Sequence, residues 1–473
     1  MVRKIARKEM TEMVRDGRFR WAAATVLLLL VCSLILGLQQ MREARAQGER
    51  AQSENWRQWL EQGERNPHSA AHFGVHAFKP TMALAFFDRG LDPYLGTSVW
   101  LEAHFQDPLR YRPAQDATAA QRFGELTAST VLQVLLPLLI ILLAFASLSG
   151  EREAGTLRQV LSLGVSRREL ALGKSLGVAG ALGLLVVPAG AVGVLALALT
   201  TPGGALLASL PRFGVLLVAY LLYFAGFLGL TLAVSALAPS SRLALMLLTG
   251  FWIVNCLLIP RAVSELAERR YPTPTATEFW DRVAVDIAKG FDGHNPDPAK
   301  LARLEERVKK QYGVTRLEEL PINFAGIRFQ AGEDHGNTVF DHHYGELWRT
   351  YRSQERLYQL AAPVAPFLAI RFLSMGLAGT DLAQHRHFAT AAERYRRMLN
   401  RKMNEAILYK SRTGDAPYFD NQTLWSSVPE FRYTAPDLSW VLRREIWNLA
   451  VLFAWTLAAG AAALLAGARM SVL

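Results

Sequence analysis

Six long apolar runs divide the chain and indicate its class. They are residues 21–38, 131–148, 176–199, 213–237, 243–260 and 446–467. Each run has the length of about 17 to 25 residues with which a helix crosses a bilayer, and none contains Asp, Glu, Lys, Arg or His. One such run also fits a buried helix of a water-soluble protein. Six of them predict an all-α polytopic membrane protein with six transmembrane helices.

Lys and Arg in the short connections predict how these helices are oriented. Residues 1–20 carry seven of them and residues 149–175 carry five, whereas residues 200–212 carry one. Basic residues in short connections collect on the cytoplasmic side of a membrane. We therefore expect the N and C termini and the 149–175 connection in the cytoplasm.

Two long segments, 39–130 and 261–445, are then extracytoplasmic, and segments of this length do not obey the charge rule. Apolar residues recur at helical spacing in 299–312 and 382–407, so both regions are expected to be mainly helical. The net charge of +11 is spread along the chain and follows in part from membrane topology, so no nucleic-acid partner is expected. Both cysteines lie in apolar runs, which argues against a disulfide framework.

Residues 1–20 form a separate element before the first run. Ile5, Met10, Met13 and Val14 are interspersed with basic residues, which predicts an amphipathic helix. Such a helix either lies along the inner surface of the membrane or is solvated.

The 149–175 connection ends in Gly173-Lys174-Ser175, which is also the end of a phosphate-binding P-loop. A P-loop requires Gly-x4-Gly-Lys-Ser/Thr between a strand and a helix. Arg168 stands where the first glycine is required, and no apolar strand precedes it. We interpret the match as a coincidence and expect no nucleotide site in this chain.

The same connection has the pattern of two helices joined by a tight turn. Residues 153–163 place Leu157, Val160 and Leu161 on one helix face, and Gly164 is positioned to end that helix. Ser166 and Glu169 have the spacing of a capping box that begins a second helix. A small apolar stripe with a charged rim suits either docking of a cytoplasmic partner or a simple solvated connection.

The order of these residues resembles the permease subunits of type-2 ABC transporters. The shared residues are Glu151-Arg152-Glu153-Ala154-Gly155-Thr156-Leu157, Val165-Ser166-Arg167-Arg168-Glu169 and Gly173-Lys174. In that family the connection is the coupling helix, which docks on the ATPase subunit. The resemblance implies that the ATPase-coupling residues are Glu151, Arg152, Glu153, Gly155, Thr156, Leu157, Val160, Leu161, Ser166, Arg167 and Glu169. The long segments make the chain similar to the subgroup with large extracytoplasmic insertions.

The apolar runs lack the ionisable groups that ion-coupled transporters carry within the membrane, so energy is expected from a partner. The resemblance implies a cytoplasmic ABC ATPase dimer that holds ATP and Mg²⁺, with no cofactor in this chain. It also implies a second permease, either a copy or a paralogue, in the cytoplasmic (inner) membrane of a bacterium. The complex would export or extract its substrate by alternating access. Membrane lipid and an envelope partner of the external regions are further expected contacts.

Polar residues inside the runs are the candidates for a substrate path. They are Gln133, Tyr220, Tyr223 and Asn255, and each also suits hydrogen bonding between helices. The aromatic side chains of Tyr220, Tyr223, Phe224 and Phe227 favour a lipid-facing or apolar path. That favours an amphipathic or lipid-like substrate.

All ten histidines fall in the two long segments. His68, His72 and His76 follow one another at intervals of four, which would align them on one helix face, and two histidines so spaced can share a metal ion. Gly74 interrupts that helix, and neither a cysteine nor a suitably spaced carboxylate completes the set. We therefore expect no metal site, and these three histidines are the candidates if one exists.

Two other classes of function remain open from the sequence. One is a membrane-anchored enzyme with an external catalytic part, although the His-Glu-x-x-His motif of metalloproteases does not occur. The other is a scaffold or sensor that presents its external helices to an envelope partner, for which a large exposed apolar patch would be the sign.

Overall fold

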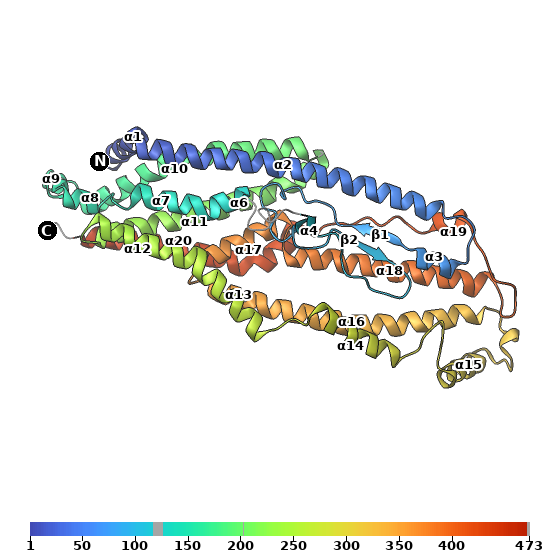
Figure 1. Ribbon diagram of the computed structural model, residues 1–473. Helices are drawn as coiled ribbons and strands as arrows, with labels where there is room; N and C mark the ends of the chain where they lie inside the picture. Colours follow the sequence, from blue (N-terminus) through green and yellow to red (C-terminus); the bar gives the residue numbers. More distant parts are fainter. Residues whose placement is uncertain (117–125, 202, 471–473) are drawn as a thin grey trace.

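The chain folds into an elongated bundle of long helices, with both termini at one end (Figure 1). This computed structural model describes residues 1–116, 126–201 and 203–470. The predicted segments 39–130 and 200–212 therefore include positions outside the described residues. We call the end with both termini the terminal end and the opposite end the distal end.

Among the described residues, six helical segments are long and apolar enough to cross a membrane, which confirms the predicted fold class. They are Phe19–Leu60, Ala128–Glu153, Arg167–Thr200, Gly204–Leu237, Ser241–Arg270 and Leu438–Arg469. They follow one another in the predicted order, and we refer to them as spans one to six.

The helix that contains span one continues far beyond residue 38, where the predicted membrane segment ends. Helix α2 (Gly17–Leu60) has 44 residues, which corresponds to about 66 Å at 1.5 Å per residue. At its far end the indole of Trp59 is fully buried and donates a hydrogen bond to the backbone carbonyl of Trp425, at 3.0 Å. One continuous helix therefore joins the apolar bundle to the distal end.

Spans two and five share an unusual construction. Span two consists of α6 (Ala128–Thr130), the π-helical segment η1 (Val131–Leu135), α7 (Leu136–Ala144) and α8 (Ser149–Glu153), and span five of α12 (Ser241–Ile253), η2 (Val254–Leu258) and α13 (Ile259–Arg270). Pro137 and Pro260 follow the two π segments at the same distance. Proline cannot donate the regular helical hydrogen bond, and a π turn is one way in which a helix absorbs that loss.

Span three is α10 (Arg167–Thr200) and span four is α11 (Gly203–Leu237). The sequence predicts a connection from 200 to 212, but α11 already begins at Gly203. Pro211 lies inside this helix. Membrane helices tolerate an internal proline because neighbouring groups satisfy the freed backbone carbonyl. Span six is α20 (Leu438–Arg469).

The predicted amphipathic helix exists as α1 (Val2–Arg15), and it packs lengthwise on α10. Three glycines of α10 form the surface that α1 contacts, and we call Gly173, Gly177 and Gly180 the glycine seat of α1. A Cβ atom at Gly173 would lie 2.6 Å from Ile5 Cβ, and one at Gly177 would lie 2.5 Å from Glu9 Cβ. Glycine is therefore required at this contact, since any larger residue would push the two helices apart.

The distal end is mainly helical. Its helices are α3 (Pro67–Phe73), α4 (Pro113–Asp116), α14 (Ala276–Ala288), α15 (Pro298–Tyr312), η3 (Leu317–Glu319), α16 (Phe324–Ala361), α18 (Leu382–Lys410) and α19 (Gln422–Ser427). Helices α15 and α18 confirm the two helices predicted at 299–312 and 382–407. The described residues of this end also form one antiparallel pair of strands, β1 (Val75–Phe78) and β2 (Ser98–Leu101), in which Val75 lies opposite Leu101.

Helix α17 (Pro366–Ala378) occupies a place that the sequence did not suggest. It packs against α20 and α11, and its side chains belong to the same buried apolar cluster as the spans. An apolar stretch of about 10 to 14 residues is too short to cross a bilayer. This helix therefore closes the apolar bundle from the distal side.

Candidate functional site

The connection between spans two and three forms a compact loop at the terminal end (Figure 1). Its middle helix is α9 (Thr156–Ser162), which is shorter than the predicted helix 153–163. The chain breaks before α9 because Gly155 has a φ of 72°, a left-handed conformation that favours glycine. Gly164, with a φ of 85°, ends the turn as predicted. The side chain of Ser166 then accepts a hydrogen bond from Glu169 N, which confirms the capping box.

Three consecutive charged residues tie this loop to three different spans. A carboxylate oxygen of Glu151 lies 3.0 Å from Lys174 Nζ in α10. The guanidinium of Arg152 donates to the carbonyl oxygens of Ala236 and Ala238, at the end of α11. Glu153 accepts hydrogen bonds from the backbone N–H and the hydroxyl of Ser241, at the start of α12.

The contacts of Arg152 and Glu153 satisfy backbone groups that the ends of helices leave without an intrahelical partner. Thr156 adds a link inside the loop, because its hydroxyl donates to the carboxylate and to the backbone carbonyl of Glu151. Arg167 reaches the carbonyl of Ala468 in the last turn of α20, at 3.5 Å. The loop therefore contacts the ends of spans three, four, five and six.

Lys174 is a structural residue rather than a phosphate ligand. Its side chain is 6% exposed, and its ammonium lies 2.9 Å from Glu9 Oε2 as well as 3.0 Å from Glu151 Oε1. Gly173 and Lys174 lie within α10, without the loop that a P-loop requires. The prediction that this stretch is not a P-loop agrees with this geometry.

The stretch from Gly173 to Gly177 also reads Gly-x-Ser-x-Gly, the spacing of a hydrolase nucleophile. In a hydrolase that serine stands on a sharp turn between a strand and a helix. Here Ser175 lies inside α10, and its hydroxyl donates to the carbonyl of Ala171 at 2.8 Å. The local fold therefore does not support a serine nucleophile at this position.

The apolar stripe of α9 faces the protein rather than the surroundings. Leu157 is 1% exposed and packs with Leu148, Leu170 and Met470, and Val160 and Leu161 pack against the same cluster. The stripe thus anchors the loop on the bundle, which differs from its expected role as a contact surface. The outward surface consists of Arg158, Gln159, Ser162, Leu163 and Gly164, and Leu163 is 80% exposed.

The candidate path residues Gln133 and Tyr220 are buried and hydrogen-bonded to each other. The amide of Gln133 donates to the Tyr220 hydroxyl at 2.8 Å, and that hydroxyl lies 3.1 Å from Ser374 Oγ in α17. Ser374 in turn donates to the carboxylate of Asp88. This chain of polar groups crosses the apolar bundle from η1 through α11 to α17.

The other two candidates join neighbouring parts of the bundle. Tyr223 donates to the backbone carbonyl of Gln133 at 3.0 Å, and Asn255 accepts from the backbone N–H of Phe367 at 3.2 Å. Gln133 and Asn255 lie in the π segments η1 and η2, and such segments are frequent at functional sites.

The four aromatic residues of α11 that the sequence singles out are buried in the bundle. Tyr223 and Phe227 are fully buried, whereas Tyr220 and Phe224 line a small apolar pocket between α2, α10 and α11. Leu30, Leu34, Gly190, Gly193 and Phe213 complete much of its wall. The pocket therefore offers apolar contact to a small ligand.

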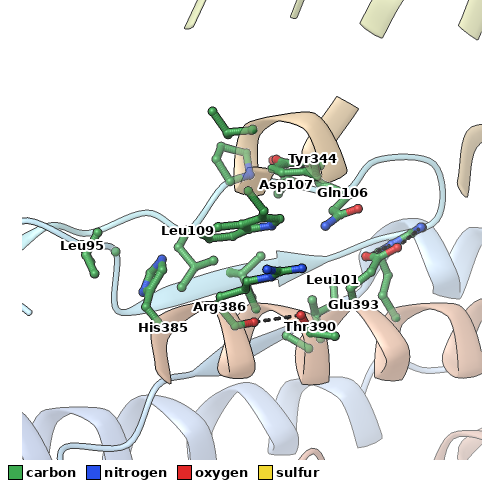
Figure 2. A pocket seen from close by; sticks show the side chains of 18 of the residues that line it. Leu95, Leu101, Gln106, Asp107, Leu109, Tyr344, His385, Arg386, Thr390 and Glu393 are labelled. Atoms are coloured by element: carbon green, nitrogen blue, oxygen red, sulfur yellow. Dashed lines mark hydrogen bonds and ion pairs between the residues drawn. The ribbon is translucent and has the colours of Figure 1, made fainter. Parts of the chain in front are cut away.

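A larger groove lies at the distal end, between the β hairpin, α16 and α18. It encloses about 540 Å³, a volume within the usual range of about 300 to 1,000 Å³ for ligand pockets. Figure 2 shows His385, Arg386, Thr390 and Glu393 along α18, with Asp107 and Tyr344 on the opposite side. Burial lowers the pKa of His385 to about 3, so its imidazole is neutral near pH 7.

The structure separates His76 from the other two candidate histidines and places those two beside two further histidines. His68 and His72 lie on α3, but His76 lies on β1, because Gly74 ends the helix as expected. His104 and His294 lie beside His68 and His72, and ligand atoms of these four rings are all within 4.8 Å of one another. Burial, followed by the neighbouring imidazoles, lowers the pKa of His68 to about 3 and that of His72 to about 4.

Comparison with known families agrees with the resemblance seen in the loop. A profile described as ABC-2 family transporter protein matches residues 3–286, more than half of the 473-residue chain. A second profile, described as a domain of unknown function (DUF3526), matches residues 276–434. A search of curated proteins finds no match. The first match contains α1, the loop and five of the six spans, and the second contains α14 to α19.

Proposed function

Because the chain belongs to the ABC-2 transporter family, we propose that it is the permease subunit of an ATP-driven exporter or extractor. Its terminal end would face the cytoplasm and its distal end the extracytoplasmic side, as the distribution of Lys and Arg predicts. The membrane would be the cytoplasmic (inner) membrane of a bacterium. The segment 261–445, which overlaps the second family match, would be the larger of two extracytoplasmic insertions.

The observation that supports this proposal most strongly is the construction of the loop. Its charged residues bond to the ends of spans three to six, and its apolar stripe is packed into the bundle. A force on α9 therefore acts on several spans at once. Rigid packing of this kind converts a small displacement at one surface into a rigid-body movement of helices.

The proposal assigns ATP hydrolysis to a separate subunit. The sequence has no Gly-x4-Gly-Lys-Ser/Thr motif, so the purified chain alone should neither bind nor hydrolyse ATP. A cytoplasmic ABC ATPase dimer holding ATP and Mg²⁺ would dock on the outward surface of α9. A second permease, identical or paralogous, would complete the transport path.

The substrate that suits the interior is amphipathic or lipid-like. The pocket beside Tyr220 and Phe224 is walled mainly by aliphatic side chains and glycine. The buried polar chain from Gln133 to Asp88 lies next to it and offers hydrogen bonds to a polar group. Alternating access would expose this region first to one side of the membrane and then to the other.

The docking surface is tested with Leu163, which is 80% exposed at the tip of the loop. Full burial of a leucine side chain contributes about 1.5 to 3 kcal/mol, so Leu163→Asp should weaken ATPase binding about tenfold or more. Co-purification of the ATPase and stimulation of its ATP hydrolysis are the readouts. Leu266→Asp is the matched control, since Leu266 is 55% exposed on α13, at the end of span five that lies away from the loop. Equal binding of both variants would contradict the proposal.

The distal groove favours an additional role in receiving a substrate or an envelope partner. Trp348, Tyr351 and Arg386 line it together with several further arginines, and Arg386 lies 5.5 Å from the ring centre of Trp348. A scaffold or sensor would use this groove without transport. Loss of ATP-dependent transport in Leu163→Asp, with the groove intact, would distinguish the permease from that alternative.

A further inference from the structure

Four histidines from three separate segments converge at the distal end. His68 and His72 come from α3, His104 follows β2, and His294 lies between α14 and α15. The Nε2 atom of His294 lies 3.0 Å from His68 Nε2, 3.4 Å from His72 Nε2 and 2.7 Å from His104 Nε2. Four ring nitrogens therefore point to one small volume.

Hydrogen bonds among the rings cannot account for this arrangement. The Nδ1–H of His68 donates to Asn404 Oδ1 at 3.2 Å, and the Nδ1 of His104 lies 2.7 Å from Glu333 Oε1. A neutral imidazole that carries its proton on Nδ1 has a lone pair on Nε2. Both of these lone pairs face the Nε2 of His294, which has at most one proton to donate. A cation at the centre satisfies all four nitrogens, whereas one proton satisfies a single pair.

Groups outside the cluster hold the rings in this orientation. Asn404 donates from its amide to Gln330 Oε1 at 3.2 Å, so its oxygen faces His68. The side chain of Glu333 is 3% exposed and lies 3.6 Å from Arg396. The ring of His68 is stacked on Phe329, with centres 3.9 Å apart and planes inclined by 6°. A carboxylate or carbonyl behind each imidazole is the usual support of a metal ligand.

We propose that His68, His72, His104 and His294 bind one divalent transition-metal ion. Imidazole nitrogens suit Zn²⁺, Cu²⁺ and Ni²⁺, and a closed set of four protein ligands is typical of structural zinc. Tetrahedral Zn²⁺ with bonds of about 2.0 Å requires nitrogens about 3.3 Å apart. The three separations of 2.7 to 3.4 Å around His294 lie close to that value. We therefore take Zn²⁺ as the ion that fits best.

The bound ion would fasten two parts of the distal end. His68, His72 and His104 belong to the segment between spans one and two, and His294 belongs to the segment between spans five and six. His294 is exposed, so the ion can enter from solvent, whereas His68 is 4% exposed and anchors the inner side. Four protein ligands leave no open position for a substrate, so the role is structural rather than catalytic.

The test is metal binding by the full-length chain without a histidine tag, after treatment with a chelator. After Zn²⁺ is added back and the excess is removed, elemental analysis should give one Zn²⁺ per chain, and calorimetric titration of the chelator-treated chain should give a single site. Co²⁺ in its place should produce the strong visible absorption of tetrahedral coordination. His294→Ala should weaken Zn²⁺ binding at least tenfold, and Glu333→Gln should weaken it about 10- to 100-fold as a positioning residue.

His76→Ala is the matched control, because His76 lies on the neighbouring strand β1 outside the cluster. It should bind Zn²⁺ as the unmodified chain does. His294 lies in a connection between helices, so its replacement leaves the helical packing intact, and circular dichroism checks this. Absence of stoichiometric Zn²⁺, unchanged binding by His294→Ala, or an equal loss in His76→Ala would overturn the proposal.

Discussion

The ammonium of Lys174 lies 2.9 Å from the carboxylate of Glu9, and this ion pair joins the N-terminal helix to span three. The same ammonium lies 3.0 Å from Glu151, at the beginning of the loop between spans two and three. One buried cation thus connects α1, α10 and the loop. The N-terminal helix, the start of span three and the proposed coupling loop are thus held together as one packed unit.

Replacing Lys174 should destabilise this unit. Lys174→Met would leave the carboxylates of Glu9 and Glu151 largely buried without their cation, and breaking a buried ion pair costs about 3 to 5 kcal/mol. Thermal unfolding in detergent should show a clear fall in Tm. Lys8→Met is the control, since the Lys8–Glu12 pair is 3.5 Å apart and exposed, and such pairs contribute well under about 1 kcal/mol. Equal Tm values for the two variants would show that the buried pair contributes little.

The glycine seat of α1 can be tested by adding bulk. A Cβ at Gly177 would lie 2.5 Å from Glu9 Cβ and 2.8 Å from the carbonyl of Ala6, so Gly177→Leu should displace α1 from α10. Trypsin should then cleave the basic residues of α1 faster, at least severalfold. Gly183→Leu is the control in the same helix, because no atom of another described element lies within 4 Å of a Cβ there. Similar cleavage of both variants would argue against the close contact.

The chain of polar groups in the bundle predicts that removal of the Tyr220 hydroxyl lowers the stability of the protein. Tyr220→Phe would leave the amide of Gln133 without its acceptor and Ser374 without one of its neighbours, and both are buried. A buried polar group that loses its partner costs about 1 to 3 kcal/mol. Tyr409→Phe, at a site that is 70% exposed, should change stability little. Chemical unfolding of the two variants compares them, and the prediction fails if Tyr220→Phe is the more stable.

Lowering the pH should reduce the free energy of unfolding because of His385, which lines the distal groove. Burial, aided by the positive charges of Lys79 and Arg112, lowers the pKa of this imidazole from 6.5 to about 3. Between these values the unfolded chain binds a proton that the folded chain does not, so stability falls as the pH is lowered from about 6.5 toward 3. The loss from this group approaches about 1.4 kcal/mol per pH unit.

His385→Asn should therefore reduce the slope of stability against pH in this range, measured by tryptophan fluorescence during urea unfolding. His342→Asn is the control, because the His342 side chain is 60% exposed. A slope that changes equally in both variants would exclude His385 as the source.

The sequence predicts the spans well because their signal is local. Charge-free runs and the spacing of Ser166 and Glu169 depend only on neighbours along the chain, and both appear in the structure. Helix α17 escaped prediction because it contains Arg371 and is too short to cross a bilayer. Its burial depends on packing against α11 and α20, which no local pattern records.

Local sequence patterns also predict the candidate site only in part. The Glu151-Arg152-Glu153 motif identifies the loop, but only the fold shows that its side chains bond to three spans and that Leu157 faces inward. Sequence spacing grouped His76 with His68 and His72, although Gly74 turns the chain away. His294 joins the cluster although it lies 226 positions after His68 in the sequence, and no periodicity predicts such a contact.

The most direct measurement of the central claim is a photo-crosslink from position 163 to the ATPase. A photoreactive amino acid replaces Leu163 in the permease co-expressed with its ABC ATPase, and Leu266 carries the same probe as the control. Irradiation of membranes should yield an adduct that contains the nucleotide-binding subunit from position 163 and none from position 266. If the assembled complex gives no such adduct from position 163, or gives it equally from position 266, the loop is not the surface through which ATP hydrolysis drives this protein.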